Sequence, residues 1–97
     1  MSELSLCSTV SAVKDQVSCD LAGEAVILSL KNGVYYTLNP MGARIWFLVQ
    51  APVPASTVRD TILAEYDVDA GRCESELLSL LKDLHREGLI EVENPNV

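Results

Sequence analysis

The spacing of apolar residues divides the chain into a first part with the pattern of strands and a second with the pattern of helices. Gln16–Leu21 alternates polar and apolar side chains, and Glu24–Leu30 is more continuously apolar. Alternation is typical of half-buried strands, so both are predicted to be strands that meet at Ala22-Gly23. Asn32-Gly33 separates the second run from Val34–Leu38, and Asn-Gly favours a type I′ hairpin turn. We therefore expect an antiparallel meander of three strands.

The pattern changes to a helical one at Asn39-Pro40. Asn39 is a favourable N-cap and Pro40 suits the first helical position, where its missing N–H costs nothing. The helices expected from there on are Pro40 to about Val49, Ser56 or Thr57 to about Tyr66, and Ala70 to Glu87 with Gly88 at the C-terminal stop. Strands followed by helices predict an α+β fold, a three-stranded antiparallel sheet followed by three helices that is winged-helix-like.

The 97 residues suffice for one compact domain with one core. We expect a flexible N-terminal arm at 1–14, a domain at 15–93 and a polar tail at 94–97. The arm leaves room for a short strand, and Leu89–Val92 is a candidate for another. No apolar run approaches the roughly 20 residues that cross a bilayer, and the Met1-Ser2-Glu3 start lacks the positive charge of a secretory signal. We therefore expect a cytoplasmic location.

The charge and the cysteines exclude several classes of function. A net charge of −7 with seven Lys and Arg argues against a nucleic-acid or anionic-membrane partner, because phosphate is bound chiefly by basic side chains. Cys7, Cys19 and Cys73 form no C-x-x-C pair, and His85, the one histidine, lies about 120° around the same helix from Cys73. Hydrophobic residues at 48% indicate a globular chain. We expect no catalytic residue, no metal, no cofactor and no enzyme activity.

The third strand and the third helix carry the candidate site. Val34–Leu38 is predicted to be an edge strand, yet it contains neither the charge nor the proline with which proteins protect such edges. At about 100° per residue, the core seam of the helix is Cys73, Leu77, Leu80 and Leu84. One flank is polar, with Arg72, Glu76, Ser79, Asp83 and Glu87; the other carries Leu78, Leu81 and His85, with Lys82 at its rim.

The widened apolar flank has two interpretations. Taken alone, Leu78 is better explained as a residue that covers the sheet edge, and His85 as a half-exposed helix residue. Beside an uncharged edge strand, the same flank forms a slot for an extended peptide, whose backbone would pair with the strand.

A stretch of motifs resembles the PqqD family: Gly33-Val34-Tyr35-Tyr36-Thr37-Leu38-Asn39, followed by Gly42 and the aromatic-bearing helix to Trp46. Further on, Glu65–Asp69 and the Leu81-to-Ile90 segment are similar to the family, so that the likeness covers about residues 16 to 92. The resemblance implies three antiparallel strands packed on three helices, and a recognition element for ribosomally made, modified peptides. It implies peptide binding by Val34, Tyr35, Tyr36, Thr37, Leu38, Leu77, Leu78, Leu81, Lys82 and His85.

Within this resemblance two roles compete. The favoured one is a stand-alone lasso-peptide protein that binds a precursor leader peptide and hands it to a leader peptidase or other modifying enzyme. The alternative is a peptide chaperone of pyrroloquinoline quinone synthesis that serves a radical enzyme. Outside it, a winged-helix DNA-binding module or a dimer through paired third strands are the rivals, and we expect a monomer or a weak dimer.

Overall fold

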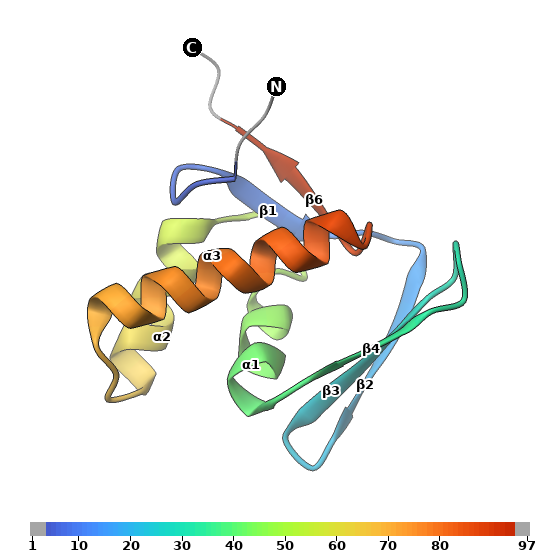
Figure 1. Cartoon of the computed structure of the whole chain (residues 1–97), viewed down its shortest axis with the longest axis horizontal. Coiled ribbons are helices and arrows are strands. Elements are labelled where there is room, and N and C mark those ends of the chain that lie inside the picture. The colour runs from blue at the N-terminus through green and yellow to red at the C-terminus, as the bar shows by residue number, and fades with distance from the viewer. Residues whose placement is uncertain (1–3, 95–97) are drawn as a thin grey trace.

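The computed structural model describes residues 4–94, which form six strands and three helices (Figure 1). In chain order they are β1 (Thr9–Ala12), β2 (Gln16–Leu21), β3 (Glu24–Ser29), β4 (Tyr35–Leu38), α1 (Pro40–Leu48), β5 (Val53–Pro54), α2 (Ala55–Glu65), α3 (Ala70–Arg86) and β6 (Ile90–Glu93). The α+β class and the three-stranded sheet followed by three helices are confirmed. Within 4–94, no helix is both long and apolar enough to cross a membrane.

The main sheet is an antiparallel meander in the order β2-β3-β4, so β2 and β4 are its edges. Leu21 pairs with Glu24 across a two-residue turn. Ala22 and Gly23 in this turn both have positive φ, 56° and 86°, which is the signature of a type I′ turn. The I′ geometry therefore occurs at the first hairpin, with an alanine at one of its left-handed positions.

The expected type I′ turn at Asn32-Gly33 is wrong. Asn32 has no positive φ; Gly33 does, at 71°, and its N–H donates to the Ser29 carbonyl at 2.8 Å, which closes an α-turn. The Asn32 side-chain oxygen accepts from the Val34 N–H at 3.0 Å. The connection is longer than a two-residue hairpin because β3 ends at Ser29 and β4 begins at Tyr35.

A second small sheet, in the order β5-β1-β6, was not foreseen as a unit. β1 lies in the segment expected to be an arm, and it pairs antiparallel with β6 from Thr9↔Glu93 to Ala12↔Ile90. The fully buried Ser8 hydroxyl donates to the Asn94 side chain beyond β6. Residues 1–3 of the expected arm and 95–97 of the expected tail lie outside the described residues, and the division at 1–14, 15–93 and 94–97 stays a prediction.

The helix ends follow the local signals. The Asn39 side chain accepts from the Gly42 N–H at 2.8 Å, and the Asp69 side chain caps α3 through the Arg72 N–H at 2.9 Å. Gly88 ends α3 with φ 74°. A Cβ on Gly42 would lie 3.2 Å from the Leu38 Cβ, so the first turn of α1 packs closely on β4. α2 begins at Ala55 behind Pro54, with no side-chain cap.

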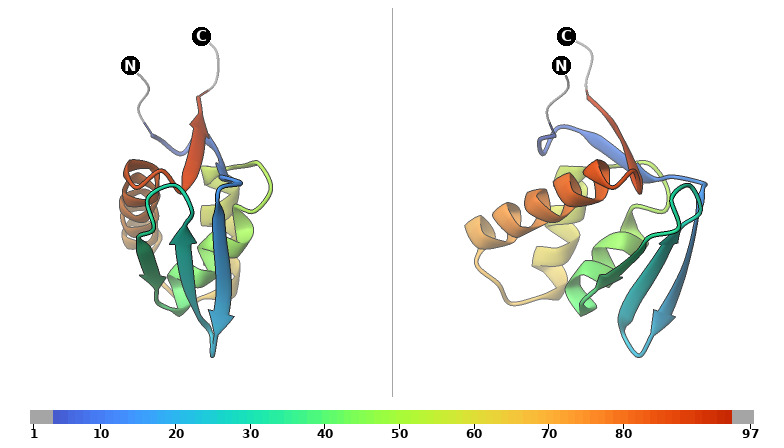
Figure 2. Two further views of the ribbon diagram at one scale, coloured as in Figure 1. Left: turned by 90° about the vertical axis from the view of Figure 1, so that its right-hand side faces the viewer. Right: turned by 45° about the vertical axis from the view of Figure 1, so that its right-hand side comes forward.

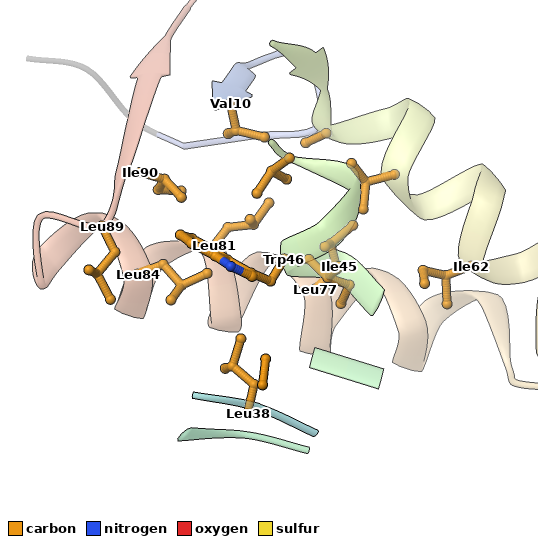
Figure 3. Packing of buried hydrophobic residues seen from close by; sticks show 14 of the residues in the cluster. Val10, Leu38, Ile45, Trp46, Ile62, Leu77, Leu81, Leu84, Leu89 and Ile90 are labelled. Carbon is orange, nitrogen blue, oxygen red and sulfur yellow. The ribbon is translucent and has the colours of Figure 1, made fainter. Parts of the chain in front are cut away.

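All three helices lie on one face of the main sheet, and the other face is uncovered by described elements (Figure 2). α1 packs on β3, while α3 runs along the β4 side of the molecule (Figures 1 and 2). Trp46 lies in the centre of the core, and Leu77, Leu81 and Leu84 point from α3 into the same cluster (Figure 3). The core therefore holds α3 in place beside β4.

Candidate functional site

The outer edge of β4 carries backbone groups with no strand beside them. Within residues 4–94, β4 pairs with β3 alone. The Ser29 N–H donates to the Val34 carbonyl at 3.0 Å, across the first residue pair of this hairpin. Because hydrogen-bonded pairs alternate along an antiparallel ladder, Tyr36 and Leu38 also bond toward β3. The N–H and C=O groups of Tyr35 and Thr37 therefore face the open edge.

The side chains of β4 alternate between the two faces of the sheet. Leu38 is buried and Tyr36 is half-buried on the helix side, while Tyr35, at 68% exposure, and Thr37 face away from the helices. Val34 precedes the strand and is exposed. The strand thus offers a backbone edge together with two side chains, Tyr36 and Leu38, that face α3.

A hollow of about 270 Å³ lies between β4, the start of α1 and α3. We call it the β4–α3 groove. It is lined by Tyr36, Thr37, Leu38, Asn39, Met41, Gly42, Ile45, Glu76 and Leu80. A second, narrower depression, too small to admit a water molecule, also borders Tyr36 and is lined by Ser29, Asn32, Val34, Tyr36, Glu87 and Leu89. The two hollows together follow the length of β4.

The α3 wall of the groove is acidic. Burial raises the pKa of the Tyr36 hydroxyl, and the negative charges of Asp83 and Glu87 raise this pKa further, while Arg86 partly opposes them. Glu87 and Tyr36 line the same depression, and Asp83 lies one turn before Glu87 on the same face of α3. Leu80 and Glu76 line the groove about one and two turns before Asp83, respectively.

The flank that meets β4 is not the one expected to do so. Leu77 and Leu81 are 1% and 0% exposed, so their side chains are core and offer nothing to a guest. Leu78, Lys82 and His85 lie on the far side of the helix from Glu76 and Asp83 at 100° per residue. On that same side, a Glu74 carboxylate oxygen lies 3.9 Å from a guanidinium nitrogen of Arg59, which belongs to α2. This side of α3 therefore faces α2 rather than β4.

The sequence pattern assigns the α3 residues beside β4 to other roles. It places Glu76, Asp83 and Glu87 on a polar flank and Leu80 in the core seam, whereas Glu76 and Leu80 line the groove and Glu87 lines the neighbouring depression. Leu80 is half-buried, with one side against the core and the other in the groove. Tyr36 is the sequence signal from which this flank could have been predicted. The hydroxyl group of a tyrosine that is partly buried against a helix favours a polar side chain on that helix as its neighbour.

A larger hollow, of about 510 Å³, lies at the opposite edge of the main sheet, between β2 and α1. Ser18, Ala43 and Phe47 are among its lining residues, and Phe47 is 72% exposed. This hollow shares no residue with the β4–α3 groove. Among residues 4–94, no cluster of three or more His, Cys, Asp or Glu side chains could hold a metal ion.

Comparison with known proteins identifies the family. The family model described as coenzyme PQQ synthesis protein D (PqqD) matches residues 24–90, which include the whole of β3, β4 and all three helices. The chain belongs to the PqqD family. The resemblance seen in the sequence from Gly33 to Trp46 is confirmed by this match.

Two solved structures are similar to this PqqD-family chain. One is described as TbiB1 in complex with the TbiA(beta) leader peptide; it is 33% identical, with a TM-score of 0.77, and the alignment covers 84% of this chain and 94% of that one. The other is described as lasso peptide synthetase B1 complexed with the leader peptide, 20% identical, with a TM-score of 0.74 and coverage of 84% and 96%. At that identity the second shows a shared fold. No curated protein matches the chain.

Proposed function

We propose that this chain binds the leader segment of a ribosomally synthesised precursor peptide as a strand added to the outer edge of β4. The open backbone groups of Tyr35 and Thr37 carry the proposal, because an extended peptide gains main-chain hydrogen bonds there and side-chain contacts in the adjoining hollows. The 33% identical chain with a leader peptide supports it. The chain acts by binding, and the chemistry belongs to the leader peptidase or other modifying enzyme that receives the leader.

On the strand side, the proposed site keeps the segment Val34–Leu38. On the helix side it takes Leu80 as the apolar wall and Glu76, Asp83 and Glu87 as the polar wall. Leu77 and Leu81 do not line the site; their buried side chains anchor α3 in the core.

We place the function in lasso-peptide biosynthesis, which the description of the second neighbour supports. The family description instead names coenzyme PQQ synthesis, and that alternative predicts a radical enzyme as the receiving partner. Cleavage of the precursor by a leader peptidase, measured with and without this chain, separates the two. Acceleration by the chain supports the lasso role, and no effect on cleavage argues for the alternative.

The test of strand addition is a proline at the open edge. Thr37→Pro removes an outward N–H, and a lost or unsatisfied hydrogen bond costs about 1–3 kcal/mol. The affinity for the TbiA(beta) leader peptide, used as the probe, should therefore fall about tenfold or more, because 1.4 kcal/mol is a factor of ten. Isothermal titration calorimetry measures the affinity, and circular dichroism verifies the fold.

The matched control is Ser18→Pro on β2, the opposite edge strand. The Leu30 N–H donates to the Asp15 carbonyl at 3.0 Å, so Asp15 and Leu30 form a hydrogen-bonded pair at the end of the ladder between β2 and β3. Hydrogen-bonded and non-bonded pairs alternate along an antiparallel ladder, so Ser18 is in a non-bonded pair and its N–H points away from β3. Both prolines thus stand at outward donors of edge strands. We expect Ser18→Pro to leave leader affinity unchanged; if Thr37→Pro does so too in a folded protein, β4 is not the docking edge.

A further inference from the structure

The charges around the β4–α3 groove come from α3. The linings contributed by β4, the start of α1 and the β3–β4 turn are Tyr36, Leu38, Met41 and other uncharged side chains. The linings contributed by α3 include Glu76 and Glu87. A peptide that runs along β4 past both hollows therefore meets a neutral strand on one side and two carboxylates, Glu76 and Glu87, on the other.

Of the three carboxylates on the flank of α3 beside β4, Glu76, Asp83 and Glu87, the first two are paired with exposed arginines. Arg72 lies 3.0 Å from Glu76, and Arg86 lies 2.9 Å from Asp83. The two arginine side chains are 77% and 71% exposed, and each partly neutralises the carboxylate with which it pairs. Glu87 forms no ion pair within residues 4–94 and lines the depression beside Tyr36.

We propose that the groove selects leaders that carry a lysine or arginine next to Glu87 and an apolar side chain at the Leu80 end. The inference rests on the proposed strand addition to β4. A basic side chain is the occupant that complements the acidic wall, and the net charge of −7 attracts it from a distance. The apolar residue fits the end of the groove where Leu38, Met41 and Leu80 converge.

The geometry of β4 sets the spacing of these two leader residues. Glu87 lines the hollow at Val34, and Leu80 lines the hollow at Leu38. The strand rises about 3.3 Å per residue, so the two ends are about 13 Å apart. Side chains on one face of an added strand recur at every second residue. The basic and apolar residues should therefore lie four residues apart, or two apart where the lysine stem spans the difference.

Selection from a displayed library of random decapeptides tests the preference. Against the folded full chain we expect enriched peptides to combine an apolar or aromatic residue with a lysine or arginine at this spacing. With Glu87→Gln the basic preference should disappear. With the matched control Glu91→Gln, an exposed carboxylate on β6 in the other sheet, it should persist.

Salt dependence gives a second measurement on one selected peptide and its lysine-to-glutamine version. An exposed ion pair contributes roughly a two- to fivefold gain in affinity at low salt, and screening weakens that gain as salt rises. The lysine peptide should therefore lose its advantage between about 50 mM and 500 mM salt, and Glu87→Gln should remove the advantage at any salt.

The outcomes separate this inference from the proposed function. Enriched peptides that bind at β4 without any basic preference, or a preference that survives Glu87→Gln, overturn the charge selection and leave strand addition standing. If no peptide is enriched and the TbiA(beta) leader peptide does not bind either, the proposed function fails, and the charge selection fails with it.

Discussion

Leu81→Ala distinguishes a core residue from a binding residue, and the structure assigns Leu81 to the core. The side chain is 0% exposed and points into the cluster around Trp46 (Figure 3). Leucine-to-alanine changes at such sites cost about 2–5 kcal/mol, the sum of the lost transfer energy and the cavity that remains. We expect about 3–4 kcal/mol here, because the residue is packed on all sides.

This loss is large for a chain of this length. At roughly 0.05–0.15 kcal/mol per residue, a domain of this size is stable by about 5–15 kcal/mol. With a urea m-value of about 1.5 kcal/mol/M, the unfolding midpoint should fall by about 2 M. Leu30→Ala is the matched control, because Leu30 is 58% exposed and its truncation should stay within about 0.5 kcal/mol.

Leader binding supplies the second half of this test. Leu81→Ala should leave the affinity of the folded fraction within about threefold, because a buried side chain makes no contact with a guest. Leu80→Ala, half-buried and open to the groove, should lose about 1–2 kcal/mol of stability and lower leader affinity about tenfold. A severe loss of affinity in folded Leu81→Ala, with stability unchanged, would refute the placement of α3.

Two further predictions follow from local geometry. Burial raises the pKa of the Cys73 thiol, so this cysteine should react slowly with iodoacetamide at pH 8. Mass spectrometry should show that the folded protein is modified at the exposed Cys7 and Cys19, and at Cys73 only after denaturation. Equal rates at all three cysteines would contradict the burial of Cys73. Gly33→Ala should lower the free energy of unfolding, measured in urea, by about 1–2 kcal/mol, because Gly33 has a φ of 71°, which strains a residue with an L side chain, although there is open space around it. Gly71→Ala is the control: this glycine lies in α3 without a positive φ, so the change should be neutral or stabilising by up to about 1 kcal/mol.

Local signals in the sequence predicted the elements whose causes are local. The Asn39 cap, the Pro40 start and the Gly88 stop each depend on a few neighbouring residues, and each is present in the structure. The strand at Gln16–Leu21 was predicted from its alternation and is present, but the half-burial expected from that pattern is wrong, because every residue from Val17 to Leu21 is exposed. The turn at Asn32-Gly33 was predicted as too short because its length depends on where both strands stop pairing.

The small sheet left no comparable signal. β1 and β6 have four residues each, and the partner of Thr9 is Glu93, at the other end of the chain. Strands this short show no sustained alternation, and a pairing over such a separation is a property of the folded whole. Val53-Pro54 is shorter still, and its proline argued against any strand.

The side of α3 that faces β4 could not be predicted, for a different reason. Hydrophobic periodicity identifies the buried stripe of α3, and the residues Cys73, Leu77 and Leu84 are buried as expected. It does not tell which of the two flanks beside that stripe meets β4, because that depends on how the helix docks. The sequence favours the wider apolar flank of Leu78, whereas the docking of the helix presents Glu76 and Glu87 to the hollows beside β4.

The small sheet explains how the edge of β4 stays open. The chain has two segments that could add themselves to this edge, the strand near its start and the strand after α3. These two pair with each other instead, with Val10 opposite Val92, and the first of them also pairs with β5. The Ser8–Asn94 hydrogen bond links the residue before β1 to the residue after β6. An open edge invites self-association, but β4 is only four residues long and the chains repel one another through their net charge of −7. A short edge of this kind binds strongly only a guest that also fills the groove beside α3.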